Sequence, residues 1–327
     1  MGIFLSFLAG LLPMLFFAWI VYWFDRYEKE PKILLGVVFI WGAVIAAGSA
    51  FVINTMLGMG VYLFTGSEAA TDLTTGALIA PVVEESLKGL AVLLVFLIFR
   101  SEFDSILDGI VYAGIVALGF AATENAYYIY RFGYAENGTN GLLWMVFVRV
   151  VMVGWQHPFY TAFTGIGLAA ARLSRHTAIK LTAPLIGWGI AVFAHSLHNT
   201  LASALSGAQD LVLGTALDWT GWFFMLLFII WIVSRERRWI SDQLQEEVFL
   251  GSITAAQYRT ACSTWFQNSA RLEALLQGRY QSTARFYQVC AELAYKKKQL
   301  TLMGEEQGNS HIIQQLRDEL LKLSPYV

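Results

Sequence analysis

The sequence GALIAPVVEESLKGLAVLLVFLIF occupies residues 76–99 and decides the fold class. A run of this length is sufficient to cross a bilayer as a helix. Glu84, Glu85 and Lys88 interrupt the run, and each charged side chain costs about 2.5–3.5 kcal/mol to insert into a membrane. A membrane chain tolerates that cost where the groups pair, face a polar cavity or do chemistry. The stretch therefore predicts a membrane helix that carries a buried polar site.

The composition places the whole chain among membrane proteins. Of its 327 residues, 57% are hydrophobic and 14% are charged, and the mean hydropathy is +0.54. We predict an all-α fold, a polytopic membrane bundle of about seven transmembrane helices followed by a C-terminal cytosolic helical segment. The expected spans are Gly2–Phe24, Ile33–Leu57, Gly76–Phe99, Ile110–Tyr130, Leu142–Ala171, Leu181–Leu205 and Leu213–Val233.

The pattern of apolar residues changes after Val233. Residues 1–233 are expected to form the transmembrane bundle, and residues 234–327 a soluble-type helical tail with breaks at Gly251–Thr254 and Gly304–Ser310. Within the bundle, the long fifth run contains Gly154 and Pro158, which favour a kinked or tilted helix.

The charges in the loops predict how the bundle lies in the membrane. The loops after the first, third, fifth and seventh runs hold ten basic residues, and the alternate loops hold one, Arg131. This bias predicts a multi-pass protein of the cell inner or plasma membrane with its N-terminus outside and its C-terminus in the cytosol. The net charge of −2 argues against a nucleic-acid partner. Membrane lipid is the expected surrounding, and the sequence names no partner for the tail.

Three further polar groups interrupt the apolar runs. They are Thr123-Glu124-Asn125, His157 with Thr161, and His195 with His198 and Asn199. Counted along the helices, Glu84, Glu124 and His198 fall at one level in the outer half of the bilayer, about 12 Å from the outer end of the third span. Helices that bury polar residues independently would not be expected to choose one layer, so we predict a shared site.

The expected site contains five reactive side chains and four supporting ones. Glu84, Glu85, Glu124, His157 and His195 are the predicted catalytic residues, and Lys88, Asn125, His198 and Asn199 the supporting ones. Because Glu84 and Glu85 point about 100° apart on a helix, only one of them aims at the centre of a site. Either is a candidate for the base that activates water, with Lys88 as its charge partner.

Two chemistries suit this set of side chains. The same five carboxylate and imidazole groups are ligands for zinc or another divalent metal. A glutamate with a raised pKa also activates water directly, with histidine and asparagine donors holding the oxyanion. Both schemes hydrolyse an amide bond.

The motifs resemble those of a known family. Glu84-Glu85-x-x-Lys88, Phe120-x-x-x-Glu124-Asn125, His157-x-x-x-Thr161 and His195-x-x-His198-Asn199 resemble the ordered motifs of the PrsW family of intramembrane proteases, and residues 25–31, DRYEKEP, are similar to its first loop. The family is distantly similar to type II CAAX prenyl endopeptidases and bacteriocin-processing proteins, where a histidine stands at the position of Glu124. The resemblance implies cleavage of single-span, membrane-anchored proteins, such as anti-sigma factors, on their extracytoplasmic side.

Two other classes of protein fit the same residues. One is a transporter or sensor in which the carboxylates and histidines carry protons or cations, although polar groups would then be expected through the full membrane depth. The other is a scaffold that binds a transmembrane helix without catalysis.

Overall fold

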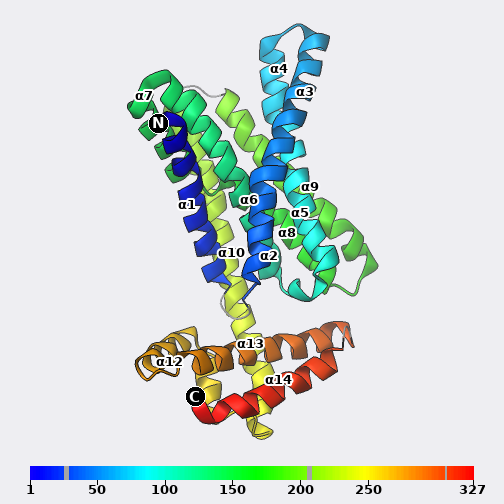
Figure 1. Ribbon diagram of the computed structural model, residues 1–327. Helices are drawn as coiled ribbons and strands as arrows, with labels where there is room; N and C mark the ends of the chain where they lie inside the picture. Colours follow the sequence, from blue (N-terminus) through cyan, green and yellow to red (C-terminus); the bar gives the residue numbers. More distant parts are fainter. Residues whose placement is uncertain (26–28, 205–207, 306–307) are drawn as a thin grey trace. The chain divides into compact units, whose positions relative to one another are not determined.

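The structure is a computed structural model that describes residues 1–25, 29–204, 208–305 and 308–327. Every regular element in these ranges is helical (Figure 1). The α-helices are α1 (Gly2–Phe24), α2 (Lys32–Ile40), α3 (Ala47–Thr65), α4 (Glu68–Thr74), α5 (Ala80–Ile98), α6 (Ile106–Tyr128), α7 (Ala135–Val146), α8 (Gln156–Leu173), α9 (Thr177–Ala204), α10 (Ala208–Phe249), α11 (Ala255–Ala261), α12 (Thr264–Leu276), α13 (Tyr280–Met303) and α14 (Asn309–Leu323).

The chain divides into two compact units. The first contains Met1–Trp23 and Glu30–Phe228, and the second contains Phe24–Lys29 and Ile229–Val327. Helix α10 runs through the boundary, so its first half belongs to the first unit and its second half to the second.

Within the described residues, five helical stretches are long and apolar enough to cross a membrane. They are Gly2–Phe24, Lys32–Thr65, Ile106–Leu173, Thr177–Ser203 and Val212–Phe249. The all-helical, multi-pass character expected from the sequence is confirmed, but the count of seven is not. Helix α5, the expected third span, is absent from this set because it holds three charged residues. The expected fourth and fifth spans lie in one 68-residue stretch, Ile106–Leu173, which contains α6, α7 and α8. The expected end of the sixth span, Leu205, lies outside the described residues.

The predicted kink in the fifth run takes the form of a break. Helix α7 passes into a π-helical turn at Phe147–Met152, and α8 begins only at Gln156. Gly154 lies in the break, and a Cβ atom there would lie 2.2 Å from the carbonyl oxygen of Val150. Pro158 lies in the first turn of α8, where its missing N–H leaves no helical hydrogen bond unmade. The break places His157 at the start of a new helix.

Helix α6 is the centre of the first unit, and small residues let its neighbours approach closely. Seventeen of its residues are buried. A Cβ atom at Gly109 of α6 would lie 2.3 Å from the carbonyl oxygen of Gly165 in α8, and one at Gly119 would lie 2.0 Å from that of Phe39 in α2. Glycine at helix contacts in membranes permits such backbone approach. The close packing fixes α6 and α8, which carry Glu124 and His157.

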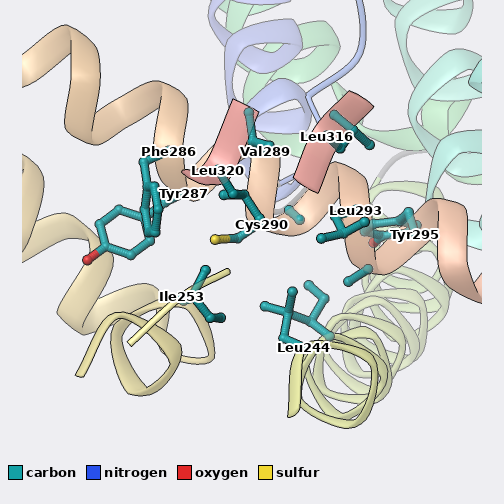
Figure 2. Close-up of a cluster of buried hydrophobic side chains, with 14 of the residues drawn as sticks. Leu244, Ile253, Phe286, Tyr287, Val289, Cys290, Leu293, Tyr295, Leu316 and Leu320 are labelled. Carbon is teal, nitrogen blue, oxygen red and sulfur yellow. The ribbon is translucent and has the colours of Figure 1, made fainter. Parts of the chain in front are cut away.

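The second unit has a hydrophobic core of its own. Figure 2 shows side chains of α10, α13 and α14 converging in it, among them Leu244, Cys290, Leu293 and Leu320. Cys262 and Cys290 are both free, and burial raises the pKa of the Cys290 thiol, which makes it unreactive.

Buried charges and a helix cap complete this unit. Glu247 is buried and accepts hydrogen bonds from Lys297 and Arg317, each at 2.8 Å. The expected break is present, since Gly251 has φ +75° and Thr254 caps α11. The second expected break ends at α14, and its residues 306–307 lie outside the described ranges.

Candidate active site

Helix α5 brings the two glutamates and the lysine of the first motif into the interior. A π-helical turn at Thr75–Ile79 leads into α5, and Pro81 lies in its first turn. Glu84 is 6% exposed, and Glu85 and Lys88 are fully buried. One helical turn separates the glutamates from Lys88, so the ammonium lies 2.5 Å from Glu85 Oε1 and 3.9 Å from Glu84 Oε2.

Glu85 is satisfied on both of its oxygens. Its Oε1 accepts a hydrogen bond from Lys88 Nζ and lies 3.0 Å from His195 Nδ1. Its Oε2 accepts a hydrogen bond of 2.8 Å from the Thr161 hydroxyl. As the 100° offset predicts, this glutamate reaches sideways to Lys88 and neighbouring helices. Both of its oxygens are thereby occupied by side chains of α5, α8 and α9.

Glu84 has the opposite surroundings. Its Oε1 lies 3.5 Å from Asn54 Nδ2, and its Oε2 lies 3.9 Å from both Lys88 Nζ and His195 Nε2. Among the described residues Oε2 has no hydrogen-bond partner, although it is buried. A buried carboxylate oxygen without a partner is costly, which makes it a candidate contact for a metal ion, a water molecule or a substrate.

The two imidazoles are each oriented by a carboxylate. His195 Nδ1 lies 3.0 Å from Glu85, and His157 Nε2 lies 2.8 Å from Glu124. The rings meet edge to face with centroids 5.3 Å apart. A carboxylate on one ring nitrogen fixes the tautomer and directs the other nitrogen, as is usual for histidines that bind metals. In His195 that other nitrogen, Nε2, lies 3.9 Å from Glu84 Oε2, whereas in His157 it is Nδ1, which lies 3.3 Å from the Lys88 ammonium.

Three of the five predicted ligands meet in one place. Glu84, His157 and His195 each offer one ligand atom, and these atoms lie within 4.8 Å of one another. One carboxylate and two imidazoles match the three-ligand sets of catalytic zinc sites, which leave a position for water or substrate. The donor set and the unpartnered Glu84 oxygen therefore fit a divalent metal. Glu85 and Glu124 instead contact the histidines, at His195 Nδ1 and His157 Nε2.

Glu124 belongs to a second charged group. Arg149 donates to Glu124 Oε2 through Nη2 and to Asn125 Oδ1 through Nε, the latter at 2.9 Å. The guanidinium also lies over the Tyr128 ring, 4.5 Å from its centroid. Arg149 thus links Asn125 to Glu124, which in turn contacts His157.

The sequence reasoning missed Asp218. This residue of α10 accepts a hydrogen bond from Gln156 Nε2. Its Oδ2 also lies 2.9 Å from His198 Nδ1, and its Oδ1 lies 3.4 Å from the Tyr160 hydroxyl. Asp218 is buried. It is the single ionisable residue of the run Leu213–Val233, and that isolation is the signal that would have found it.

The remaining supporting residues line a cavity of about 430 Å³ together with the reactive ones. His198 and Asn199 contribute to its wall, and Asn199 Nδ2 donates to the Gly76 carbonyl at 2.8 Å. The polar residues around the cavity include Asn54, Thr75, Glu84, Glu124, Arg149, Gln156, His157, His195, His198 and Asn199. The four motifs thus meet around one polar cavity within an apolar bundle.

Comparison with known proteins identifies the family. The model of the PrsW family of intramembrane metalloproteases matches residues 30–233. The chain belongs to this family. The protease PrsW of Bacillus subtilis strain 168 is 27% identical over 224 residues, which cover 68% of this chain and 88% of that protein. The protease PrsW of Clostridioides difficile strain 630 is 34% identical over 125 residues, or 38% of this chain and 50% of that protein. No solved structure gives a significant match.

Membership of the PrsW family decides between the classes considered from the sequence. The chain is a multi-pass membrane protein and an intramembrane endopeptidase, rather than a transporter or an inactive scaffold. The resemblance to the PrsW family is confirmed. The part of the chain after Phe249, with helices α11 to α14, lies beyond the family match.

Proposed function

We propose that this PrsW-family protease hydrolyses a peptide bond in the membrane segment of a single-span protein, with Glu84 as the residue that accepts the proton of the attacking water. The observation that carries the proposal is the unpartnered, buried Oε2 of Glu84 beside two imidazoles, each held by its own carboxylate. General bases of this kind contribute about 10²–10⁴-fold to a rate.

The two carboxylates behind the histidines have a different role in this scheme. Glu85 holds His195, and Glu124 holds His157. Lys88 neutralises Glu85 and lies over the Phe120 ring at 4.4 Å, which keeps its charge away from the bulk of the lipid. Of the two candidates for the base, Glu84 is the one that lines the cavity.

The same cluster suits a divalent metal ion. Glu84, His157 and His195 would hold it, and zinc is favoured by the nitrogen and oxygen donor set. Such an ion supplies Lewis-acid polarisation of the scissile carbonyl and lowers the pKa of water. A carboxylate can bind a metal through one oxygen and accept a proton at the other. Glu84 Oε2 faces His195 and Oε1 faces Asn54, so both roles are compatible there.

The loop charges support a topology of seven crossings, with the N-terminus outside, residues 1–233 as the catalytic bundle and residues 234–327 as a cytosolic appendage. The site then lies in the outer half of the bilayer. Substrates would be membrane-anchored regulators, including anti-sigma factors, cut near their extracytoplasmic side.

The test uses the full chain reconstituted into lipid vesicles with a single-span substrate. We expect cleavage by the wild type, about one divalent metal ion per chain by elemental analysis, and loss of cleavage in Glu84→Gln. Absence of cleavage by a folded, metal-loaded wild type against a panel of single-span substrates would refute the proposal. Equal cleavage by Glu84→Gln would refute the role of Glu84.

A further inference from the structure

A second cavity adjoins the active site and opens between α3 and α6. Its volume is about 570 Å³, and its lining is mostly apolar and aromatic, with Phe51 of α3 and Phe120 and Tyr127 of α6. The Phe51 and Tyr127 rings meet edge to face with centroids 6.0 Å apart, which links the two helices. We call this cavity the α3–α6 groove.

The α3–α6 groove is continuous with the active-site cavity. Five residues line both: Asn54, Thr75, Glu84, Glu124 and Tyr128. An apolar segment that lies in the groove therefore reaches the polar junction at Glu84 directly from the groove. Phe51 is 60% exposed and Tyr127 46% exposed, so in a bilayer lipid-facing side chains border the groove.

Unpartnered polar atoms mark the place where the two cavities meet. Asn54 Oδ1, Thr75 Oγ1 and Glu84 Oε2 are each buried, and none has a hydrogen-bond partner in the part of the chain that the structure describes. The Nδ2 of Asn54 faces Glu84 at 3.5 Å, which turns Oδ1 away from that carboxylate. A buried polar group without a partner destabilises the folded chain. Three of them at one junction indicate a ligand with both hydrogen-bond donors and acceptors.

The unwound backbone of a membrane segment is such a ligand. A transmembrane helix pairs every backbone N–H and C=O internally, and hydrolysis requires that a turn opens around the scissile bond. The groups set free need new hydrogen-bond partners, and each is costly if it is left without one in an apolar surrounding. Asn54 Oδ1 accepts from an N–H, and the Thr75 hydroxyl donates to a C=O or accepts from an N–H.

We infer that the substrate's membrane segment enters through the α3–α6 groove, and that Asn54 and Thr75 bind its unwound backbone beside Glu84. The inference rests on the proposed function, because it assigns the route and the backbone contacts of the same substrate. It makes Asn54 and Thr75 substrate-binding residues of a chain whose chemistry lies on α5, α8 and α9.

The first experiment measures cleavage of a single-span substrate by the reconstituted full chain. Asn54→Leu and Thr75→Val keep the shape and remove the polar atoms, and each is expected to lower kcat/KM by about 5- to 100-fold, which corresponds to one lost hydrogen bond to a buried group. Thr75→Ser keeps the hydroxyl and should retain the wild-type rate. The matched control is Thr65→Val, on α3 like Asn54, because the Thr65 hydroxyl bonds to its own helix at Val61.

A second experiment needs no catalysis. A photo-crosslinking phenylalanine analogue at Phe51 should capture the substrate segment, and the same analogue at Phe224, an exposed position of α10, should capture much less. In the cleavage assay, wild-type rates in Asn54→Leu and Thr75→Val would overturn the proposed backbone contacts. In the crosslinking assay, equal capture of substrate at Phe51 and Phe224 would overturn the proposed route. If no substrate is cleaved at all, the proposed function fails, and the crosslinks still decide the route.

Discussion

Glu84 and Glu85 are adjacent in the sequence, but their replacement by glutamine should have different consequences. The polar neighbours of the Glu84 carboxylate lie at 3.5–3.9 Å, and one of its oxygens has no hydrogen-bond partner among the described residues. Glu84→Gln should therefore change the free energy of unfolding by less than about 1 kcal/mol. Its activity should fall by about 10²–10⁴-fold, the contribution of a general base.

Glu85→Gln should reduce both stability and activity. The substitution removes the carboxylate charge that lies 2.5 Å from the fully buried ammonium of Lys88. The nearest carboxylate that remains to Lys88 is then that of Glu84, at 3.9 Å. Breaking a buried ion pair from one side costs about 3–5 kcal/mol. At about 2–4 °C per kcal/mol for a unit of this size, the unfolding midpoint should fall by about 6–20 °C.

The assay follows thermal unfolding in detergent by intrinsic fluorescence, together with single-turnover cleavage of a reconstituted single-span substrate. Glu68→Gln, an exposed position of α4, is the control and should match the wild type in both measurements. Equal decreases of the midpoint in the Glu84 and Glu85 variants would refute the reasoning, as would a Glu84 variant with more than a tenth of wild-type activity. In either case the unequal surroundings of the two carboxylates would have no functional meaning.

Three further predictions concern the metal, a positioning residue and helix packing. His195→Ala should lower the metal content below about a tenth of the wild-type value at equal protein, because one of three ligands is removed; unchanged content by elemental analysis would contradict the donor set. Asp218→Asn should lower kcat by about 10–100-fold with metal content unchanged, because Asp218 orients His198 from outside the donor set, and a wild-type kcat would contradict this. Gly109→Val should prevent folding of the bundle, because the added Cβ atom would lie 2.3 Å from the carbonyl oxygen of Gly165. The measurement is aggregation on size-exclusion chromatography, and the control is Gly36→Val, since no atom lies within 4 Å of a Cβ atom at Gly36. A monodisperse Gly109 variant would contradict the packing argument.

Much of the candidate site was predictable because each motif lies in an apolar run. A charged or imidazole group in such a run needs a partner, and the partners lie on other helices, so Glu84, Glu124, His157 and His195 were expected to meet. Helical geometry also predicted that Glu84 and Glu85 would diverge by about 100°. It did not indicate which of them faces the cavity, because that depends on how α5 is rotated against α8 and α9.

Asp218 shows the limit of reasoning from motifs. It is 20 residues from His198 in the sequence and belongs to no repeated spacing, so only the packing of α10 beside α8 and α9 reveals the contact between them. The number of membrane-crossing helices is a similar case. The 68-residue apolar stretch from Ile106 to Leu173, which contains three helices, and the three charges of α5 make composition an incomplete guide to the spans.

The sequence by itself determined that this protein is a helical membrane protein with a buried polar site, because hydropathy fixes the solvent of each helix and an intramembrane charge requires a partner, and its motifs resembled those of the PrsW family. Only the tertiary structure decided that Glu85 holds His195 while Glu84 faces the cavity, and that the groove between α3 and α6 reaches Glu84. Those features depend on helix rotation and on close glycine contacts, which arise from the simultaneous packing of many side chains and leave no local pattern in the sequence.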